Sequence, residues 1–378
     1  MNLRRFPDVE GPGLVAVDAA DRLILDELPA LPGPAPRARN EVAVIDDAYG
    51  ALTLGLVGLI DGPGKIRVHQ DLVTGERALA ANAERNTTTG YHSMRWGPEL
   101  FDGARLVVMR LPRSLDRLTE VSALIAARAA PDVVVVAGGR IKHMTPRMND
   151  VLREVFDRVD VSHARQKSRV LFARGPRTGA ADRLLLEWPR TEFHPGLDLT
   201  IAAHGGVFAG TGVDIGTRLL LAHLARPAQN GLPDVETVVD LGCGNGTVSA
   251  WFGRAHPDVR IVAVDRSASA VDSTRVTAAL NGVADRIEVA QSDGAQILPG
   301  ATADLVLLNP PFHSDAAVST AVALRLFAEA GRILKPGGEL WCVWNSHLRY
   351  RGALQRIVGP TRQVVRNHKF TVTASTRR

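Results

Sequence analysis

An apolar strand runs directly into a glycine-rich turn in Val238-Val-Asp240-Leu-Gly242-Cys243-Gly244-Asn245-Gly246. Glycines at such a strand-to-helix turn let the backbone approach a ligand without a Cβ in between. The dinucleotide fingerprint requires G-x-G-x-x-G, whereas the spacing here is G-x-G-x-G, with Thr247 in place of the third glycine. The turn therefore predicts a Rossmann-like α/β unit with a ligand at the strand end, and it disfavours an NAD-dependent oxidoreductase.

Acidic residues end the next two predicted strands. Asp265 comes 19 residues after Gly246, where an acid commonly accepts hydrogen bonds from ribose hydroxyls. Asp293 closes the following strand and is placed to reach an adenine amino group. Taken singly, an Asp at a strand end is as often a helix N-cap. Together with Asp240, these acids around one glycine turn favour a nucleoside-bearing ligand at the carboxyl edge of the sheet.

A second apolar run, which begins at Asp304, ends abruptly in Asn309-Pro310-Pro311-Phe312. Two consecutive prolines cannot continue a sheet ladder, so the strand must stop there and present its amide and its aromatic ring. A rigid amide beside a stacking ring suits the binding of a planar amine. The two motifs together predict a cofactor next to an amino-group acceptor.

Length and composition favour a two-domain soluble protein. The chain has 378 residues, which exceeds the roughly 250 to 300 at which single cores stop growing. Its 45% apolar and 22% charged residues are ordinary, no apolar run approaches the roughly 20 residues of a membrane span, and the start lacks the apolar core of a signal peptide. Cys243 and Cys342 are the only cysteines, which excludes a disulfide framework and a Cys-built zinc site. We expect a cytoplasmic protein with no membrane and no metal.

The charge distribution is informative only near the carboxyl terminus. The net charge is +5 and Arg outnumbers Lys by 40 to 5. After Glu339 the chain has no acidic residue, and its basic residues are Arg349, Arg351, Arg356, Arg362, Arg366, Lys369, Arg377 and Arg378. Guanidinium groups suit phosphate recognition, but an arginine-rich composition and a solvated tail explain the run equally well. Both interpretations stay open.

Strands and helices alternate regularly from Val42 onward, and the second half repeats the scheme. The opening, up to about Arg39, is expected to be a loose lead-in with one strand at 23–26. Strands are predicted at 42–45, 66–69, 105–110, 133–137, 169–173, 237–241, 260–265, 287–291, 304–309 and 338–343, and helices at 115–129, 147–156, 268–280 and 316–334. Such alternation indicates mainly parallel sheets built from βαβ units.

The two halves align at nearly constant separations, which indicates a duplication. The matched pairs are Asp46 with Asp240 and Asp71 with Asp265 at 194, Asn86 with Asn281 at 195, and Pro112 with Pro311 at 199. The first half has a single Gly50 in its turn, and Arg110-Leu-Pro112-Arg113 stands where the Asn-Pro-Pro-Phe motif stands. We therefore predict a degenerate domain at 1–185 and a catalytic domain at 186–378.

These motifs resemble those of class I S-adenosylmethionine methyltransferases that modify planar exocyclic amines. The stretch Val207-Phe208-Ala-Gly-Thr211-Gly212-Val-Asp214-Ile-Gly216, and His313 after the prolines, are similar to tandem-domain ribosomal-RNA guanine-N2 methyltransferases of the RsmC/RlmG type. The resemblance implies two tandem Rossmann-like domains, S-adenosyl-L-methionine as cofactor, and ribosomal RNA, or a ribosomal subunit or assembly intermediate, as partner. It also implies RNA or substrate recognition by the degenerate domain. A monomer is expected.

The resemblance also implies roles for individual residues. The predicted catalytic residues are Asn309, Pro310, Pro311 and Phe312. The predicted cofactor-binding residues are Phe208, Asp240, Gly242, Cys243, Gly244, Asn245, Gly246, Asp265, Arg266, Asp293, Gly294 and Asn309. The predicted substrate-binding residues are Phe312, His313, Arg349 and Arg351. The Asn309 oxygen and the Pro310 carbonyl would accept the two amine hydrogens, and Phe312 would stack on the base for about 1 to 3 kcal/mol.

Other acceptors share this motif. Adenine-N6 and glutamine-N5 methyltransferases use the same Asn-Pro-Pro-aromatic arrangement, and a non-catalytic RNA-binding factor in ribosome assembly would keep the same fold. A guanine acceptor must be flipped out or single-stranded, because its amine is inaccessible in a stacked duplex.

Overall fold

In the computed structural model, the chain folds into two compact units, Met1–Trp188 with His204–Gly206, and Pro189–Ala203 with Val207–Arg378. The structure describes residues 1–31, 36–225, 235–311 and 316–378. The strands of the first unit are β1 Val42–Ile45, β2 Ile66–His69, β3 Tyr91–Ser93, β4 Leu106–Arg110, β5 Val134–Arg140, β6 Phe156–Val161 and β7 Ser168–Pro176. Its helices are α1 Ala19–Glu27, α2 Ala51–Leu59, α3 Val73–Arg85, α4 Leu115–Arg128, α5 Arg147–Val155 and α6 Thr178–Leu185.

The second unit repeats these elements and adds a hairpin. Its strands are β8 Arg190–His194, β9 Leu199–Ala203, β10 Thr237–Leu241, β11 Arg260–Asp265, β12 Ile287–Gln291, β13 Ala303–Leu308, β14 Leu334–Asn345, β15 Thr361–Arg366 and β16 Phe370–Thr376. Its helices are α7 Ile215–Leu224, α9 Thr247–Ala255, α10 Ala268–Leu280, α11 Ala316–Ile333 and α12 Arg351–Ile357.

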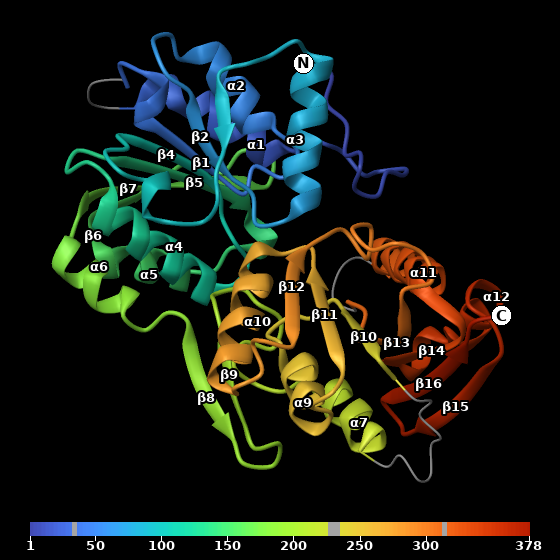
Figure 1. The fold of residues 1–378 in the computed structure, drawn as a ribbon. Helices are drawn as coiled ribbons and strands as arrows, with labels where there is room; N and C mark the ends of the chain where they lie inside the picture. Colours follow the sequence, from blue (N-terminus) through green and yellow to red (C-terminus); the bar gives the residue numbers. More distant parts are fainter. Residues whose placement is uncertain (32–35, 226–234, 312–315) are drawn as a thin grey trace. The chain divides into compact units, whose positions relative to one another are not determined.

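Each unit is built on a seven-stranded sheet with the same strand order. The order is β3-β2-β1-β4-β5-β7-β6 in the first unit and β12-β11-β10-β13-β14-β16-β15 in the second (Figure 1). The pairings among the first five strands of each order are parallel, and the last two are antiparallel. The predicted fold class, two tandem α/β domains with mainly parallel sheets, is confirmed.

Apolar helices cover both faces of each sheet. In the first unit α1, α2 and α3 pack on one face, and α4 and α5 pack on the other. In the second unit, α7, α9 and α10 pack on one face of the sheet, and α11 and α12 pack on the other. Because both faces are covered, the central strands are buried throughout, as the continuous apolar runs of the sequence predict.

The lead-in contains a helix where we predict a strand. Residues 23–26 lie in α1, whose N-cap Asp18 accepts hydrogen bonds from the backbone of Ala20 and Asp21, while the Asp21 side chain accepts one from the Asp18 backbone. This capping box starts a helix that buries Leu23 and Ile24. The strand prediction was wrong because a short apolar run does not distinguish a strand from a buried helix segment.

The duplication is confirmed by the shared topology, but two of the aligned pairs were wrong. Helices α2 and α9 both begin after a left-handed glycine, Gly50 and Gly246, which lie 196 positions apart. At that separation Val44 matches Asp240, and Asp46 lies beyond the end of its strand. The N-caps of α3 and α10 lie 195 apart, so Gln70, and not Asp71, matches Asp265. The first unit therefore lacks both acids at the corresponding strand ends.

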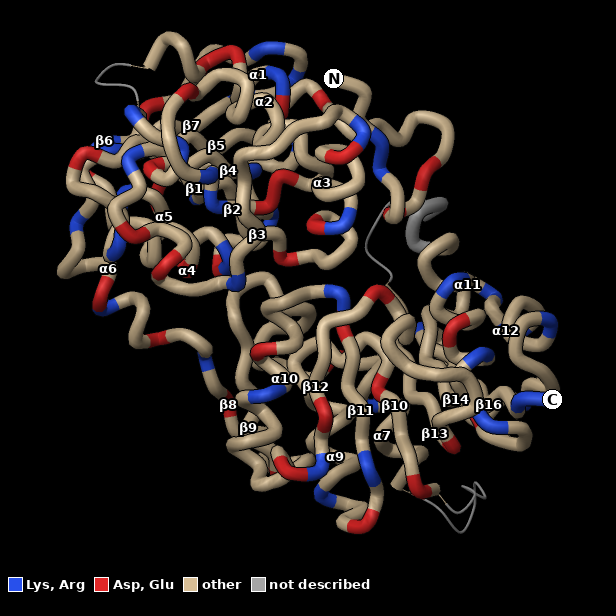
Figure 2. Tube along the Cα trace, turned by 45° about the horizontal axis from the view of Figure 1, so that its top comes forward, with Lys and Arg blue, Asp and Glu red and all other residues tan. Residues whose placement is uncertain are grey.

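The basic run at the carboxyl terminus is part of the second sheet and is not a solvated tail. It forms α12, β15 and β16 (Figure 2). Arg362 donates hydrogen bonds to the Glu339 carboxylate and lies over the Trp341 ring, and Arg377 donates to the Leu334 carbonyl. The strand predicted at 338–343 begins earlier, because Leu334 already pairs with Ala303 across a register shift.

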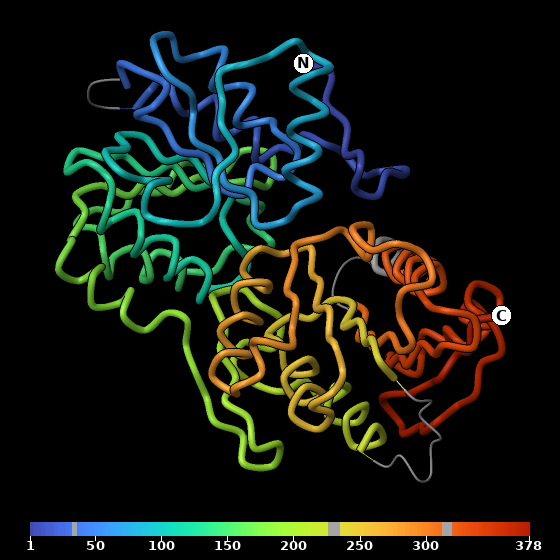
Figure 3. The backbone as a smooth tube through the Cα atoms, viewed as in Figure 1, coloured from blue at the N-terminus to red at the C-terminus, as the bar shows by residue number. Residues whose placement is uncertain are grey.

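The hairpin of β8 and β9 is fastened to the second unit through α10, and Figure 3 shows the yellow-green hairpin beside this orange helix. Asn281, the C-cap of α10, exchanges hydrogen bonds with the backbone N–H and carbonyl of Thr200. In the first unit, Asn86 makes the same pair of bonds with Asn2. The matched asparagines at a separation of 195 thus have one shared structural role.

Replacement of Gly138 by Ala is expected to destabilise the first unit. A Cβ at this position would lie 2.3 Å from Cγ1 of Ile24, which is fully buried between α1 and β5. We expect the free energy of unfolding to fall by about 1 to 3 kcal/mol, as for other overpacked cores. Chemical denaturation measures this. The control is Gly179→Ala in α6, where a Cβ meets nothing within 4 Å; equal stability of the two variants would contradict the packing argument.

Candidate active site

The glycine turn after β10 leaves open space at the end of the strand. Gly242, Gly244 and Gly246 have φ angles of 85°, 57° and 78°, in the left-handed region that favours glycine. A Cβ on Gly246 would lie 2.9 Å from Cα of Thr274, so this glycine is required by helix packing. A Cβ on Gly242 or Gly244 would meet nothing within 4 Å. These two glycines therefore border space that a ligand can take.

Two acids lie beside this turn in different environments. The half-buried Asp265 accepts hydrogen bonds from the backbone N–H of Gly244 and of Ser267, at 3.0 and 2.9 Å. Asp240 is buried, accepts a hydrogen bond from the Ser249 hydroxyl, and has its pKa raised to about 6, mainly by burial. Asp265 thus ties the turn to β11, while Asp240 lies beneath the turn.

Cys243 is a packing residue of the turn. Its side chain is buried, and the Thr274 hydroxyl donates a hydrogen bond to its Sγ atom at 3.2 Å. Burial raises the pKa of the thiol well above its usual value. A thiol that resists ionisation is a poor nucleophile, as the absence of a basic residue in the motif also predicts.

Asp293, which follows β12, carries a buried oxygen with no partner. Its Oδ1 atom accepts a hydrogen bond from Arg325 at 2.6 Å, whereas its Oδ2 atom is buried and makes no hydrogen bond. Buried polar atoms are seldom left unpaired, because each lost hydrogen bond costs free energy. Asp293 therefore offers an acceptor to a ligand at the carboxyl edge of the sheet, close to the left-handed Gly294.

Asn309, directly after β13, is held in one orientation. Its Nδ2 group donates hydrogen bonds to Oδ2 of Asp214 at 3.1 Å and to Oγ1 of Thr217 at 3.0 Å. A carboxylate can only accept, so Asp214 fixes which end of the amide faces it. Among the described residues, the buried Oδ1 atom of Asn309 has no hydrogen-bond partner. The site thus presents a second unpaired acceptor, aimed by its neighbours.

The corresponding position in the first unit has the opposite chemistry. There Arg110 ends β4 and donates hydrogen bonds to Asp18 and Asp21, which are the N-cap and third residue of α1. Asp214 and Thr217 have the same places on α7. A helix N-terminus therefore holds the side chain at the strand end in both units, but a guanidinium offers only donors.

Most predicted cofactor residues lie around one cavity. Phe208, the residues from Gly242 to Asn245, Asp240 and Asn309 all line it, together with Asp214 and Thr217. Phe208 is 46% exposed, unusually high for so large an apolar side chain. The predicted residues Arg266 and Gly294, and the acids Asp265 and Asp293, are placed at the same sheet edge by the parallel register of β10, β11 and β12.

Asn245 has a structural side chain. Its Nδ2 group donates hydrogen bonds to the carbonyls of Gly210 and Gly212, and its Oδ1 atom accepts one from the Thr247 hydroxyl. These bonds fasten the loop that carries Phe208 to the glycine turn. The Asn245 backbone carbonyl also accepts a hydrogen bond from the Thr277 hydroxyl, so this residue shapes the turn through both its side chain and its carbonyl.

The structure describes only some of the residues that are predicted to bind the acceptor. Pro310 is buried and Pro311 is exposed; Phe312 and His313 lie outside the described residues. Arg349 is exposed and has a left-handed φ of 52°, and Arg351 begins α12 and donates to the Thr361 carbonyl. Neither arginine lines the cavity.

Sequence reasoning missed Asp214 and Thr217 as site residues. The sequence carries a signal for Asp214, an acid before a helix, and this residue does accept hydrogen bonds from the backbone of Gly216 and Thr217. The hydrogen bond between Asp214 and Asn309 joins residues that are 95 positions apart, so no local sequence pattern predicts it.

In the part of the chain that the structure describes, no group of three or more His, Cys, Asp or Glu residues is arranged to hold a metal ion. Within the same residues, no helix is both long and apolar enough to cross a membrane.

Known proteins match this chain along nearly its whole length. The family models for the RLMG N-terminal domain and the Methyltransferase small domain match residues 1–177 and 198–374. Ribosomal RNA large subunit methyltransferase G of Pseudomonas entomophila is 34% identical and that of Streptomyces coelicolor 33%, each over 98% of this chain and 96% of the relative. The solved structure of T. Thermophilus 16S rRNA methyltransferase RsmC, in complex with AdoMet and guanosine, has a TM-score of 0.75 at 22% identity and covers 94% of this chain and 92% of its own.

The fold and the second family model together define a methyltransferase with two tandem α/β domains. The chain belongs to the ribosomal RNA large subunit methyltransferase G family. The family and the enzyme class that the motifs predict are confirmed.

Replacement of Asp240 by Asn is expected to change the pH dependence of stability. The folded-state pKa of about 6 lies above the unfolded value near 4. Ionisation of Asp240 therefore lowers the free energy of unfolding of the protein as the pH rises from about 4 to 6. The Asn side chain has no such titration and can still accept the Ser249 hydrogen bond. The free energy of unfolding of the Asp240→Asn variant, relative to the unmodified protein, should therefore rise between pH 4 and 7, by up to about 3 kcal/mol.

Chemical denaturation at several pH values tests this. The control is Asp272→Asn, a partly exposed acid on α10 that pairs with Arg275. A difference for Asp240→Asn that stays constant with pH would refute the raised pKa.

Proposed function

We propose that this protein transfers the methyl group of S-adenosyl-L-methionine to the exocyclic N2 amine of a guanine in the RNA of the large ribosomal subunit. Membership of the methyltransferase G family supports the reaction and the RNA substrate. The observation that carries the proposal is the unpaired, buried Oδ1 atom of Asn309, held in place by Asp214 and Thr217.

The residues around the glycine turn fit this cofactor. Asp265 is assigned to accept hydrogen bonds from ribose hydroxyls. The buried Oδ2 atom of Asp293, which has no partner among the described residues, is assigned to an adenine amine. Gly242 and Gly244 leave space next to their backbone, and the exposed ring of Phe208 offers an apolar surface. In this assignment Cys243, Asn245 and Gly246 shape the turn, and Arg266 and Gly294 flank the two acids.

The mechanism follows from the chemistry of an aromatic amine, whose nitrogen lone pair is delocalised into the ring. Oδ1 of Asn309 accepts one amine hydrogen, and the Pro310 carbonyl is assigned the other. Two such bonds draw the nitrogen toward tetrahedral geometry and localise its lone pair. The bound cofactor supplies an electrophilic methyl sulfonium, so in-line positioning by these residues provides much of the rate enhancement.

The prolines and the residues after them complete the acceptor site in this proposal. Pro310 and Pro311 end the strand and prevent the amide from entering the sheet ladder. Phe312 is assigned to stack on the base, and His313 to contact it. The exposed Arg349, which lies between β14 and α12, and the exposed Arg351, which begins α12, are assigned to RNA.

The two domains have different roles in this proposal. Residues 186–378 carry out catalysis, and residues 1–185 contribute to RNA recognition, because Arg110 and its acids replace the acceptor amide in the first unit. The substrate is ribosomal RNA, free or within a subunit or assembly intermediate. A cytoplasmic location and a monomeric state accord with this role and stay predictions.

Deletion of the gene is expected to remove one N2-methylguanosine from the RNA of the large subunit. Mass-spectrometric mapping of methylated nucleosides in ribosomal RNA, from strains with and without the gene, measures this directly. The unmodified gene should restore the nucleoside. An unchanged N2-methylguanosine pattern would overturn the proposal, and a lost N6-methyladenosine would assign the site to adenine.

Substitutions of Asn309 and of Thr217, which orients its amide, should lower kcat to different extents. Asn309→Ala removes the acceptor and should lower kcat for methyl transfer by about 10²-fold or more, by analogy with the loss of one preorganised hydrogen-bonding group. Thr217→Val keeps the shape of the side chain but removes one of the two acceptors that orient the amide, and should lower kcat about tenfold. Calorimetry with the cofactor separates a loss of cofactor binding from a loss of methyl transfer in both variants.

The matched control is Thr217→Ser, which keeps the hydroxyl and should retain near-normal kcat. Full activity of Asn309→Ala would refute the role of the amide. Equal kcat values for Thr217→Val and Thr217→Ser would refute the role of the hydroxyl.

A further inference from the structure

The first unit contains a cavity at the carboxyl ends of β4 and β5, the position that corresponds to the acceptor site of the second unit. Its volume is about 150 Å³, several times the roughly 30 Å³ that one water occupies in the liquid. Its lining includes Arg110, Arg113, Arg140 and His143, with Gly138 and Gly139 of β5. Three guanidinium groups thus surround one cavity.

Only one of these arginines is neutralised by acids. Arg110 is bound by Asp18 and Asp21, so its charge is compensated within the unit. Arg113 donates a hydrogen bond to Nε2 of His143 at 3.2 Å; since a guanidinium only donates, this nitrogen must be the acceptor.

Arg140 has no such compensation. Its Nε atom is buried and makes no hydrogen bond, although the residue as a whole is half-buried. Within the described residues, no carboxylate pairs with Arg113 or Arg140. In the part of the chain that the structure describes, Arg113 and Arg140 therefore line the cavity without a carboxylate of their own, whereas Arg110 is held by two.

The chain around the cavity is also basic. Residues 133–149 and 161–181 contain no Asp or Glu. The two segments meet where Arg140 pairs with Ser168 across β5 and β7, and the Ile141 backbone N–H donates to the Lys167 carbonyl. Lys142 and Lys167 are thereby brought close to Arg140. Neither segment supplies a carboxylate to the cavity, although Asp26 and Asp160 from outside them pair with Arg165 and Arg174.

We propose that this cavity binds phosphate, and that the phosphate belongs to the backbone of ribosomal RNA. Guanidinium groups match the several acceptor oxygens of a phosphate with fixed, paired donors. Free inorganic phosphate has the same chemistry, but a nucleic-acid partner is favoured because half or more of protein contacts to nucleic acids are to phosphates and sugars. This choice of source rests on the proposed ribosomal RNA substrate.

The test uses the full-length protein and its Arg113→Gln/Arg140→Gln double variant. Binding to a transcribed large-subunit ribosomal RNA is measured by fluorescence anisotropy over a series of salt concentrations. We expect about tenfold weaker binding near physiological salt, and a plot of log affinity against log salt that is shallower by about 1, as for the loss of one phosphate contact. Calorimetry with inorganic phosphate should detect binding by the unmodified protein and none by the double variant.

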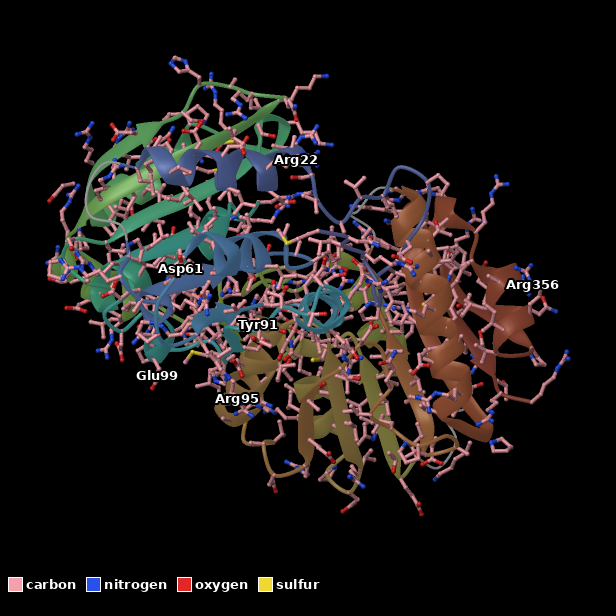
Figure 4. All side chains as sticks on the ribbon, turned by 90° about the horizontal axis from the view of Figure 1, so that it is seen from above. Arg22, Asp61, Tyr91, Arg95, Glu99 and Arg356 are labelled. Carbon is pink, nitrogen blue, oxygen red and sulfur yellow. The ribbon has the colours of Figure 1, made fainter. Side chains whose placement is uncertain are left out.

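The matched control is Arg22→Gln. This arginine is exposed on α1 of the same unit (Figure 4) and does not line the cavity. Circular dichroism melting checks that the variants are folded, and Arg140→Lys, which keeps the charge, should recover part of the RNA affinity.

Two results would overturn the proposal. If the double variant binds RNA as tightly and with the same salt dependence as Arg22→Gln, the cavity does not hold RNA, and loss of inorganic-phosphate binding in that variant would then assign the cavity to the free anion. If the double variant still binds inorganic phosphate as the unmodified protein does, the cavity is not a phosphate site. Methyl transfer is assayed separately at saturating RNA: its absence from the unmodified protein would sink the proposed function while leaving the RNA-binding result standing.

Discussion

The hydrogen bonds from the Asn309 amide to Asp214 and Thr217 are the constraint on which the site depends. They join the end of β13 to the start of α7, so that the acceptor oxygen can point only one way. The same loop that carries Asp214 is tied to the glycine turn, because Asn245 donates to its carbonyls at Gly210 and Gly212. The acceptor amide and the cofactor turn are thus parts of one hydrogen-bonded framework, and a shift in either would be transmitted to the other.

The first unit keeps this framework and changes what it holds. Asp18 and Asp21 occupy the places of Asp214 and Thr217, and Arg110 occupies the place of the amide. The left-handed Gly50 still starts the helix after the first strand. What the duplication preserved is therefore the geometry of strand, turn and helix. What it lost are the two acids at the positions of Asp240 and Asp265 and the acceptor amide at the position of Asn309.

Features that depend on neighbouring residues were predictable from the sequence. The prolines after Asn309 end their strand, and the glycines after Asp240 turn into a helix, because these effects act within a few residues. The helix at 19–27 and the register of Asp46 were not predictable. Three consecutive apolar residues fit a strand or a helix, and a constant separation between the halves does not reveal a two-residue shift. The contact of Asn309 with Asp214 joins distant segments, and only the folded chain brings them together.

The two units also differ in how completely the polar groups at the end of β4 and of β13 are paired. In the second unit the buried oxygens of Asn309 and Asp293 lack partners, and each such atom costs about 1 to 3 kcal/mol relative to a satisfied one. In the first unit the guanidinium of Arg110 and the acids at the start of α1 satisfy one another. In a unit without catalytic function, Arg110, Asp18 and Asp21 can all pair with one another. An active site must leave some hydrogen-bond acceptors unpaired so that its ligands can bind them. At this strand end, the unpaired oxygen of Asn309 therefore distinguishes the second unit from the first more directly than the fold, which both copies share.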